Sequence, residues 1–199
     1  SNIGRIGMMA FGTGVTDAVI SGNSYTGKGV GDWLDYGIEV GGGAIATITG
    51  NTIVDCLGVA SSDGSESAGI LATTYFGPGT TATITGNTIS NNSMGIAVGY
   101  DESDTSLVVV HENLIVGNPV DIVSTAAFVD AELNYWGTPC GPDVVYGDVD
   151  YTPWYDDDTL TTSSSTGTIS GVQTFGAGST TEYMQGQITC AVPGTIFNF

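Results

Sequence analysis

An octapeptide that occurs twice places the strongest constraint on the fold of this chain. Residues 46–53 and residues 82–89 both read Ala-Thr-Ile-Thr-Gly-Asn-Thr-Ile. Weaker copies surround Asn23, Asn113 and Asn134, so that the consecutive asparagines are 28, 36, 26 and 21 residues apart. Self-similarity at such intervals is typical of solenoids, in which stacked repeats bury together an apolar face that one repeat cannot bury alone.

A second marker makes the irregular spacing interpretable. Each asparagine is followed by a short apolar segment, namely Gly37-Ile38, Gly69-Ile70, Gly95-Ile96 and Val120-Asp121-Ile122. The shortest separations, 9 residues from asparagine to isoleucine and 12 from isoleucine to asparagine, give a unit of 21 residues. The longer repeats are therefore interpreted as this unit with loops inserted.

The octapeptide has the pattern of a β-strand that ends in a turn. Its apolar residues alternate with threonines, which predicts that Ile48 and Ile84 point inward and that Thr47 and Thr83 point outward. The glycine permits a corner in the backbone, and stacked asparagine amides can hydrogen-bond along the axis. We therefore expect an asparagine ladder formed by Asn23, Asn51, Asn87, Asn113 and Asn134. The alternative is a set of unrelated β-turns with matching letters.

The end of the repeat array adds a resemblance to a known family. The chain reads Asn134-Tyr135-Trp136-Gly137, then Gly141-Pro142, then Val149-Asp150-Tyr151-Thr152-Pro153-Trp154. It resembles the right-handed parallel β-helix repeats of the pectate-lyase-like superfold, and in particular secreted and cell-surface modules of bacteria and archaea. The resemblance implies an all-β, right-handed parallel β-helix of about five to six coils. It implies no particular activity, because lyases, hydrolases, adhesins and structural proteins share this fold.

Composition divides the chain into three segments. We predict a parallel β-helix at residues 1–155, a linker rich in Ser, Thr and Asp at residues 156–168, and a β-rich tail at residues 169–199. The tail returns to apolar residues without the asparagine repeat. It is expected to pack on its own coil or on a neighbouring molecule.

Charge argues against several partners. The 199 residues hold 2 Lys and Arg against 21 Asp and Glu, for a net charge of −19. Nucleic acids and anionic membranes are poor partners for such a chain. No apolar run is long enough to cross a bilayer. We expect an extracellular or cell-surface location.

Three cysteines are an odd number, which suggests bonds between chains in an extracellular protein. Cys56 and Cys140 lie three predicted coils apart, too far for a disulfide within one chain. The expected intermolecular disulfide residues are thus Cys56, Cys140 and Cys190, and three buried thiols are the alternative. No Cys and His pattern of a zinc site is present.

No convincing catalytic constellation is visible, so we do not expect an enzyme. Arg5 and Lys28 lie in no recognisable motif, and His111 is predicted to point outward from a corner position. Acidic turns could hold structural Ca²⁺ through oxygen ligands, and this is the only cofactor considered. The candidates are Asp101, Glu102, Asp104, Asp148, Asp150, Asp156, Asp157 and Asp158.

Two functions fit these features. The first is a structural, self-assembling extracellular protein of a sheath, surface layer or filament, with copies of itself as partners, stacked amyloid-like coils and disulfides between subunits. By analogy it resembles a methanogen-type archaeal envelope sheath. The alternative is a carbohydrate-binding or polysaccharide-degrading β-helix module, with Trp33, Tyr75 and Phe76 on a stacking surface.

Overall fold

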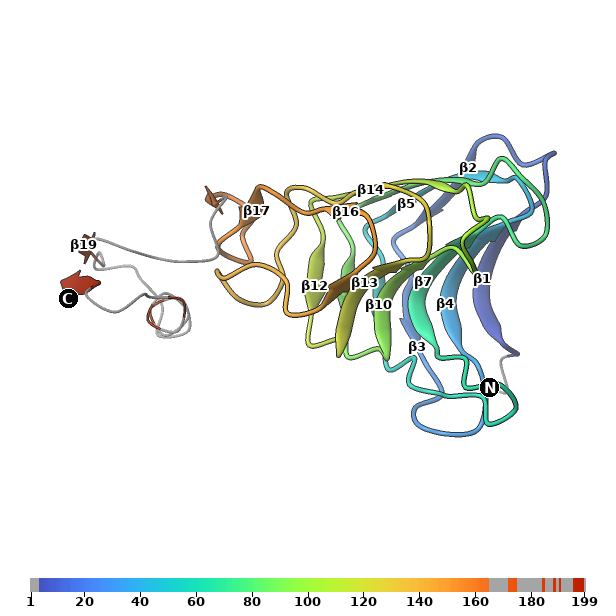
Figure 1. The fold of residues 1–199 in the computed structure, drawn as a ribbon, viewed down its shortest axis with the longest axis horizontal. Coiled ribbons are helices and arrows are strands. Elements are labelled where there is room, and N and C mark those ends of the chain that lie inside the picture. Colours follow the sequence, from blue (N-terminus) through green and yellow to red (C-terminus); the bar gives the residue numbers. More distant parts are fainter. Residues whose placement is uncertain are drawn as a thin grey trace.

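The chain winds into an all-β parallel solenoid with three faces, as the asparagine repeat predicts (Figure 1). This computed structural model describes residues 4–164 and, beyond them, residues 172–174, 184, 188, 190 and 195–198. Three parallel sheets, here named A, B and C, surround one apolar core. No helix among the described residues is both long and apolar enough to span a bilayer.

Each coil contributes one strand to each sheet, in the order A, B, C. Sheet A consists of β1 (Ile6–Phe11), β4 (Tyr36–Gly41), β7 (Ala68–Thr73), β10 (Met94–Val98), β13 (Val120–Ser124) and β15 (Val145–Tyr146). Sheet B consists of β2 (Ala18–Ser21), β5 (Ile45–Thr49), β8 (Thr81–Thr85), β11 (Leu107–His111), β14 (Val129–Asp130) and β16 (Val149–Asp150). Sheet C consists of β3 (Ser24–Thr26), β6 (Thr52–Val54), β9 (Thr88–Ser90) and β12 (Leu114–Val116).

Sheet C has four strands, so the solenoid has four complete coils. Two further coils continue in sheets A and B alone, which makes the complete coils slightly fewer than the five to six expected. In the fifth coil, Tyr135 pairs with Leu114 by an isolated bridge only. The adjacent Trp136 is buried in the core. Its large side chain fills the space that a sheet C strand of the fifth coil would cover.

Columns of isoleucine and valine form the core. The octapeptide residues Ile48 and Ile84 pair in register in sheet B, and Val110 continues their column. The other two sheets add Ile38, Ile70, Ile96, Ile122, Ile53, Ile89 and Ile115, all completely buried. Burying one such side chain stabilises the fold by about 1.5–3 kcal/mol, so the columns dominate the favourable energy.

Glycines bring the backbone of sheet A against sheet C. A β-carbon at Gly69 would lie 2.9 Å from Cγ2 of Ile89, and one at Gly37 would lie 2.5 Å from Cγ2 of Ile53. The Gly-Ile pairs of the sequence thus mark a close approach of two sheets. In the fifth coil the equivalent residue is Asp121, which accepts a hydrogen bond from the backbone N–H of Asp143 at 2.9 Å. Burial raises the pKa of Asp121 to about 6.

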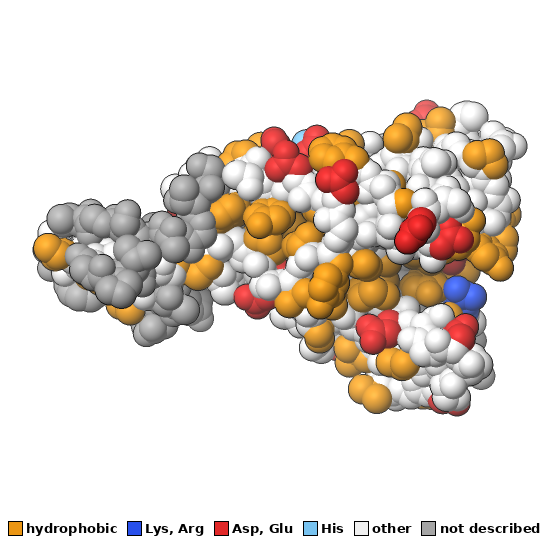
Figure 2. Space-filling model, in the orientation of Figure 1, with side chains coloured by type: hydrophobic (Ala, Val, Ile, Leu, Met, Phe, Trp, Pro, Cys, Tyr) orange, Lys and Arg blue, Asp and Glu red, His pale blue; other side chains and the backbone are white. Residues whose placement is uncertain are grey.

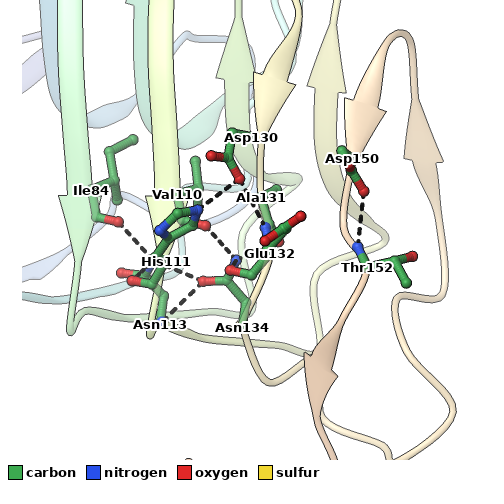
Figure 3. A network of polar contacts seen from close by, with 10 residues as sticks. All are labelled: Ile84, Val110, His111, Asn113, Asp130, Ala131, Glu132, Asn134, Asp150 and Thr152. Atoms are coloured by element: carbon green, nitrogen blue, oxygen red, sulfur yellow. Dashed lines mark hydrogen bonds and ion pairs between the residues drawn. The ribbon is translucent and has the colours of Figure 1, made fainter. Parts of the chain in front are cut away.

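The five repeat asparagines stack in one hydrogen-bonded column. In the first four, the side-chain amide donates to Oδ1 of the asparagine in the next coil at 2.9 Å, and the backbone N–H donates to the same oxygen at 2.9–3.0 Å. The second amide hydrogen bonds backbone carbonyls, as Asn113 does to Ile84 (Figure 3). The column therefore satisfies polar groups at a corner closed to water.

A second, shorter asparagine column lies at the other end of sheet C. Asn92 donates from its side chain to Oδ1 of Asn118 at 3.1 Å, and the backbone N–H of Cys56 donates to Oδ1 of Asn92 at 3.0 Å. We did not predict this column. Its spacing, 36 and then 26 residues, equals that of Asn51, Asn87 and Asn113 and could have shown it.

The strands after the last coil are short. β17 (Trp154–Tyr155) pairs antiparallel with β18 (Ser163–Ser164), so part of the linker predicted at 156–168 is a hairpin. β19 (Val172–Thr174) pairs in parallel with β20 (Ile196–Asn198). The rest of the predicted tail at 169–199 lies largely outside the described residues.

The asparagine column gives a stability prediction. We expect Asn87→Ala to lower the free energy of unfolding by about 2–4 kcal/mol, because it leaves two buried donors of Asn51 without their acceptor. Chemical denaturation measures the change. The control is Thr83→Ala, which removes an outward side chain of the same repeat and is expected to cost less than about 1 kcal/mol. Equal losses in the two variants would contradict the structural role of the column.

Candidate functional site: an aromatic row beside sheet A

The outer face of sheet A is apolar. Side chains on and beside the strands of this sheet form a second hydrophobic cluster outside the core. This cluster consists of Tyr36, Ala68, Leu71 and Ala97, with Ile6, Leu34, Met94 and Val123 packed against it. Figure 2 shows hydrophobic side chains along a depression between two raised parts of the molecule.

Loops of unequal length raise the two sides of this face. The loops at residues 74–80 and 99–106 follow strands β7 and β10, whereas those at residues 27–35 and 55–67 precede strands β4 and β7 (Figure 1). Because the strands are parallel and in register, loops that follow them project on one side and loops that precede them project on the other.

Four aromatic side chains form a continuous row on the side of the following loops. The ring centroid of Phe76 lies 5.3 Å from that of Phe11 and 4.8 Å from that of Tyr75. The Tyr75 centroid lies 4.9 Å from that of Tyr100. All three contacts are edge to face, and the side chains are 43–61% exposed. We call these four residues the aromatic row.

The row combines residues of three coils, the first, third and fourth, because the second coil has almost no loop there. The turn Gly41-Gly42-Gly43 joins β4 directly to the next strand, and residues 74–80 of the third coil lie over it. A β-carbon at Gly43 would lie 2.6 Å from the carbonyl oxygen of Pro78, and φ of Gly43 is +84°. Glycine is therefore required at this position for the loop to reach Phe11.

Asp104 fastens the two loops that carry the row. Its carboxylate accepts hydrogen bonds from the hydroxyl of Thr73 at 2.9 Å, the backbone N–H of Thr74 at 2.8 Å, and the backbone and hydroxyl of Ser106 at 2.9 and 2.6 Å. Burial alone would raise the pKa of Asp104, but these hydrogen bonds outweigh it and hold the pKa below its usual value.

The row ends at a shallow depression. Tyr100 shares a hydrogen bond of 3.0 Å with the hydroxyl of Ser103, and Asp101 accepts from the backbone N–H of Ser103 at 2.7 Å. The depression is lined by Asp101, Glu102, Ser103 and Thr125. Carboxylates therefore adjoin aromatic rings at this end of the row.

Glu39 stands on the apolar face itself. It lies between Ile38 and Val40, which point into the core, so its side chain points outward. One carboxylate oxygen lies 3.7 Å from where a β-carbon of Gly41 would be, close to Phe11. The residue is 2% exposed, and no described residue donates a hydrogen bond to it. Burial raises its pKa, and the charge of Arg5 partly offsets this rise.

The two basic side chains, Arg5 and Lys28, contact aromatic rings that do not belong to the row. The guanidinium of Arg5 lies 5.1 Å from the ring centre of Tyr36, and Nζ of Lys28 lies 5.6 Å from that of Trp33. Lys28 also donates to the carbonyl of Leu34 at 3.0 Å. The predicted stacking residue Trp33 is thus separated from Tyr75 and Phe76, because it precedes β4 and packs on the opposite side of sheet A.

The calcium candidates occupy several separate turns. No three Asp, Glu, His or Cys side chains converge on a cation position anywhere in the described part of the chain. Asp101 and Asp104 are engaged as described above. Asp150 accepts from the backbone of Thr152 at 3.2 Å, and Asp157 from that of Thr159 at 2.9 Å. Glu102, Asp148 and Asp158 stand on turns, and their carboxylates form no hydrogen bond with a described residue. One oxygen of Asp156 is buried without a hydrogen bond from that part of the chain.

The cysteines differ from expectation. Cys140 and Cys190 form a disulfide within one chain, with their Cα atoms 5.5 Å apart, so these two are not free to join subunits. The prediction missed this bond because the tail that carries Cys190 has no repeat from which its position could be derived. Cys56 is a free thiol, completely buried, and burial raises its pKa to about 12. It therefore matches the alternative of a buried thiol.

His111 is partly exposed on the outer face of sheet B. Its Nε2 lies 2.7 Å from a carboxylate oxygen of Asp130 (Figure 3). Asp150 stands beside Asp130 in the next strand of the sheet. His111 and Asp130 form a hydrogen-bonded pair on the outer surface of sheet B.

The aromatic row and the carboxylates beside it can stack on a ligand and accept hydrogen bonds from it. Exposed aromatic rings present flat apolar faces to ring-shaped ligands, and adjacent carboxylates accept hydrogen bonds from hydroxyl groups. Glycoside hydrolysis requires two carboxyl groups that face one bond from opposite sides. On the outer face of sheet A, Glu39 stands without a second carboxylate across from it among the strand residues that the structure describes.

Comparison with known families agrees with the fold. The family model described as the right-handed beta helix region matches residues 1–136. The chain belongs to the right-handed β-helix family. No curated protein and no solved structure matches the chain. A right-handed β-helix domain fits a role at a surface or on a polysaccharide.

The role of Asp104 gives a prediction about the site. We expect Asp104→Ala to speed amide hydrogen exchange in residues 74–80 and to lower the free energy of unfolding by about 2–4 kcal/mol, because several donors lose their acceptor. Since the pKa of Asp104 is lowered, its contribution is complete above the ordinary value of 3.8 and is lost as pH falls through the folded pKa.

Asp63→Ala serves as the control for this prediction. It removes an exposed carboxylate from the loop at 55–67, on the other side of sheet A. We expect little change in the exchange of residues 74–80. If the Asp104 variant exchanges as slowly as this control, the carboxylate does not hold the two loops.

Proposed function

We propose that this β-helix protein binds a polysaccharide along the outer face of sheet A, with the aromatic row as its stacking surface. The observation that carries the proposal is the continuity of Phe11, Phe76, Tyr75 and Tyr100 over three coils. An extended polymer presents successive rings along one direction, and the row runs along the axis of the solenoid.

The construction of the row supports a binding role. Four large aromatic side chains are exposed at the surface, three of them in loops where polar residues are common and Phe11 at the end of β1. Fixed loops hold them through the hydrogen bonds of Asp104, which reduces the entropy lost when a ligand binds. The proposal places the protein outside the cell, where polysaccharides are the common matrix.

The binding role is tested by truncating the row. We expect Tyr75→Ala and Phe76→Ala each to weaken binding of the polysaccharide by about tenfold or more, because truncating an aromatic anchor at the centre of an interface costs about 2 kcal/mol or more. Affinity electrophoresis in gels cast with different soluble polysaccharides measures the loss.

Phe128→Ala is the matched control. Phe128 is also largely exposed, but its neighbour Val129 pairs with Val108, which places Phe128 beside Leu107 on the outer face of sheet B. We expect its removal to leave migration unchanged. Binding that survives both row substitutions, or that fails equally in the control, contradicts the proposal.

A structural, self-assembling role is the second candidate, and the strand edge favours it. Within the described residues, β1, β2 and β3 pair with a neighbour on one side only. Such an edge can accept a strand from another copy of the protein. Disulfides between subunits are no longer part of this candidate, because Cys140 and Cys190 pair within the chain.

The disulfide gives a prediction that distinguishes a bond within one chain from bonds that link subunits. On a non-reducing denaturing gel we expect a single monomer band that migrates faster than the reduced chain, because the bond closes a loop between residues 140 and 190. Cys56→Ser is expected to leave this pattern unchanged. A ladder of oligomers that disappears on reduction would contradict the pairing and restore disulfide-linked assembly.

A further inference from the structure

We infer that the polysaccharide is one without acidic groups, whose hydroxyl or ammonium groups donate hydrogen bonds to Glu39 on the outer face of sheet A. This inference rests on the proposed function and specifies its ligand class. Two independent features carry it: the balance of charge around the face, and a carboxylate on the face to which no described residue donates a hydrogen bond.

The charge around the face is negative on both sides. Asp101, Glu102 and Asp104 lie in the loop that carries Tyr100, and Asp63 lies in the loop on the opposite side. Over a chain with a net charge of −19, no group of basic residues offsets these acids. An acidic polymer would therefore meet repulsion along its whole length.

The positive charge of Arg5 is already shared by the protein's own acids. Its charge lowers the pKa of Glu39 and that of Asp63, and its guanidinium stacks on Tyr36. In Figure 2 a single small blue area, the colour of Lys and Arg side chains, lies at one end of the depression. One guanidinium with two carboxylates around it leaves no excess positive charge for the carboxylates of a ligand.

The carboxylate of Glu39 can accept hydrogen bonds from a ligand. A buried carboxylate normally accepts two or more hydrogen bonds, as Asp104 does from Thr73, Thr74 and Ser106. Glu39 is 2% exposed as a residue, and no described residue donates to its carboxylate. Its oxygens are not among the completely enclosed polar atoms without a partner, so they reach the surface, where a ligand can meet them. The apolar neighbours on the face strengthen any hydrogen bond made there, because they lower the local dielectric constant. A sugar hydroxyl or ammonium group supplies the missing donor.

The orientation of Glu39 also connects it to the aromatic row. Its carboxylate approaches Gly41, which lies in register with Phe11 on one side and Thr73 on the other. A sugar stacked on the Phe11 end of the row thus places its edge over Glu39. Stacking and hydrogen bonding act on one ligand in this arrangement.

The test compares four oligosaccharides of equal length by isothermal titration calorimetry with the full chain. They are oligomers of glucose, of glucosamine, of N-acetylglucosamine and of galacturonic acid. We expect the galacturonic acid oligomer to bind at least about tenfold more weakly than the best of the other three. Equal or tighter binding of that acidic oligomer would overturn the inference while leaving the proposed function intact.

Glu39→Gln examines the contact itself. Its shape is kept while the charge is lost, so we expect the best non-acidic oligomer to bind about tenfold more weakly, because hydrogen bonds to charged groups are the stronger kind. The control Glu132→Gln removes the same charge from the sheet B side (Figure 3) and is expected to change nothing. If the two variants behave alike, Glu39 does not contact the ligand and the inference fails.

Two further outcomes separate the sources of binding. If none of the four oligomers binds, the proposed function fails together with the inference. If the glucosamine oligomer alone binds, and neither Glu39→Gln nor Phe76→Ala weakens it, the attraction comes from the net charge of the protein and the inference is overturned. A loss in both variants supports a site built from the carboxylate and the row.

Discussion

Hydrogen bonds between stacked asparagines make the corners of this solenoid possible. At each corner the chain leaves sheet B and enters sheet C, and the backbone groups there have no strand partner. Asn51 and Asn87 supply the missing donors and acceptors from their side chains, and the same side chains join one coil to the next. The isoleucine columns contribute more energy, but apolar burial has no direction. The polar column fixes which coil lies on which, and hence the register of all three sheets.

A constant core with variable loops explains where the site lies. Strands of one coil superimpose on those of the next, whereas the loops differ from a three-glycine turn to thirteen residues at 55–67. Loops that follow sheet A bring Tyr75 and Tyr100 next to Phe11, although these residues are far apart in the sequence. The rigid ladder sets the spacing between coils, and the loops determine the chemistry presented at that spacing.

The asparagine column, the inward isoleucines and the parallel coils were predictable because each repeats with identical letters. The sequence also pointed to Tyr75 and Phe76 as exposed aromatics, but it assigned Trp33 to the same surface. Loop geometry decides such assignments, and no repeat encodes it. The register could have drawn attention to Phe11, since it ends the strand that pairs with Gly41. Tyr100 and the disulfide between Cys140 and Cys190 depend on the paths of loop and tail segments, which local patterns do not determine.

The absence of a side chain at Gly43 keeps the aromatic row continuous. A single methyl group there would act as a wedge beneath Pro78, since the carbonyl of Pro78 lies within contact distance of where that methyl would be. The loop at residues 74–80 would move outward, which would separate Phe76 from Phe11 and interrupt the aromatic row. The length of the continuous exposed aromatic surface thus depends on a side chain that is absent.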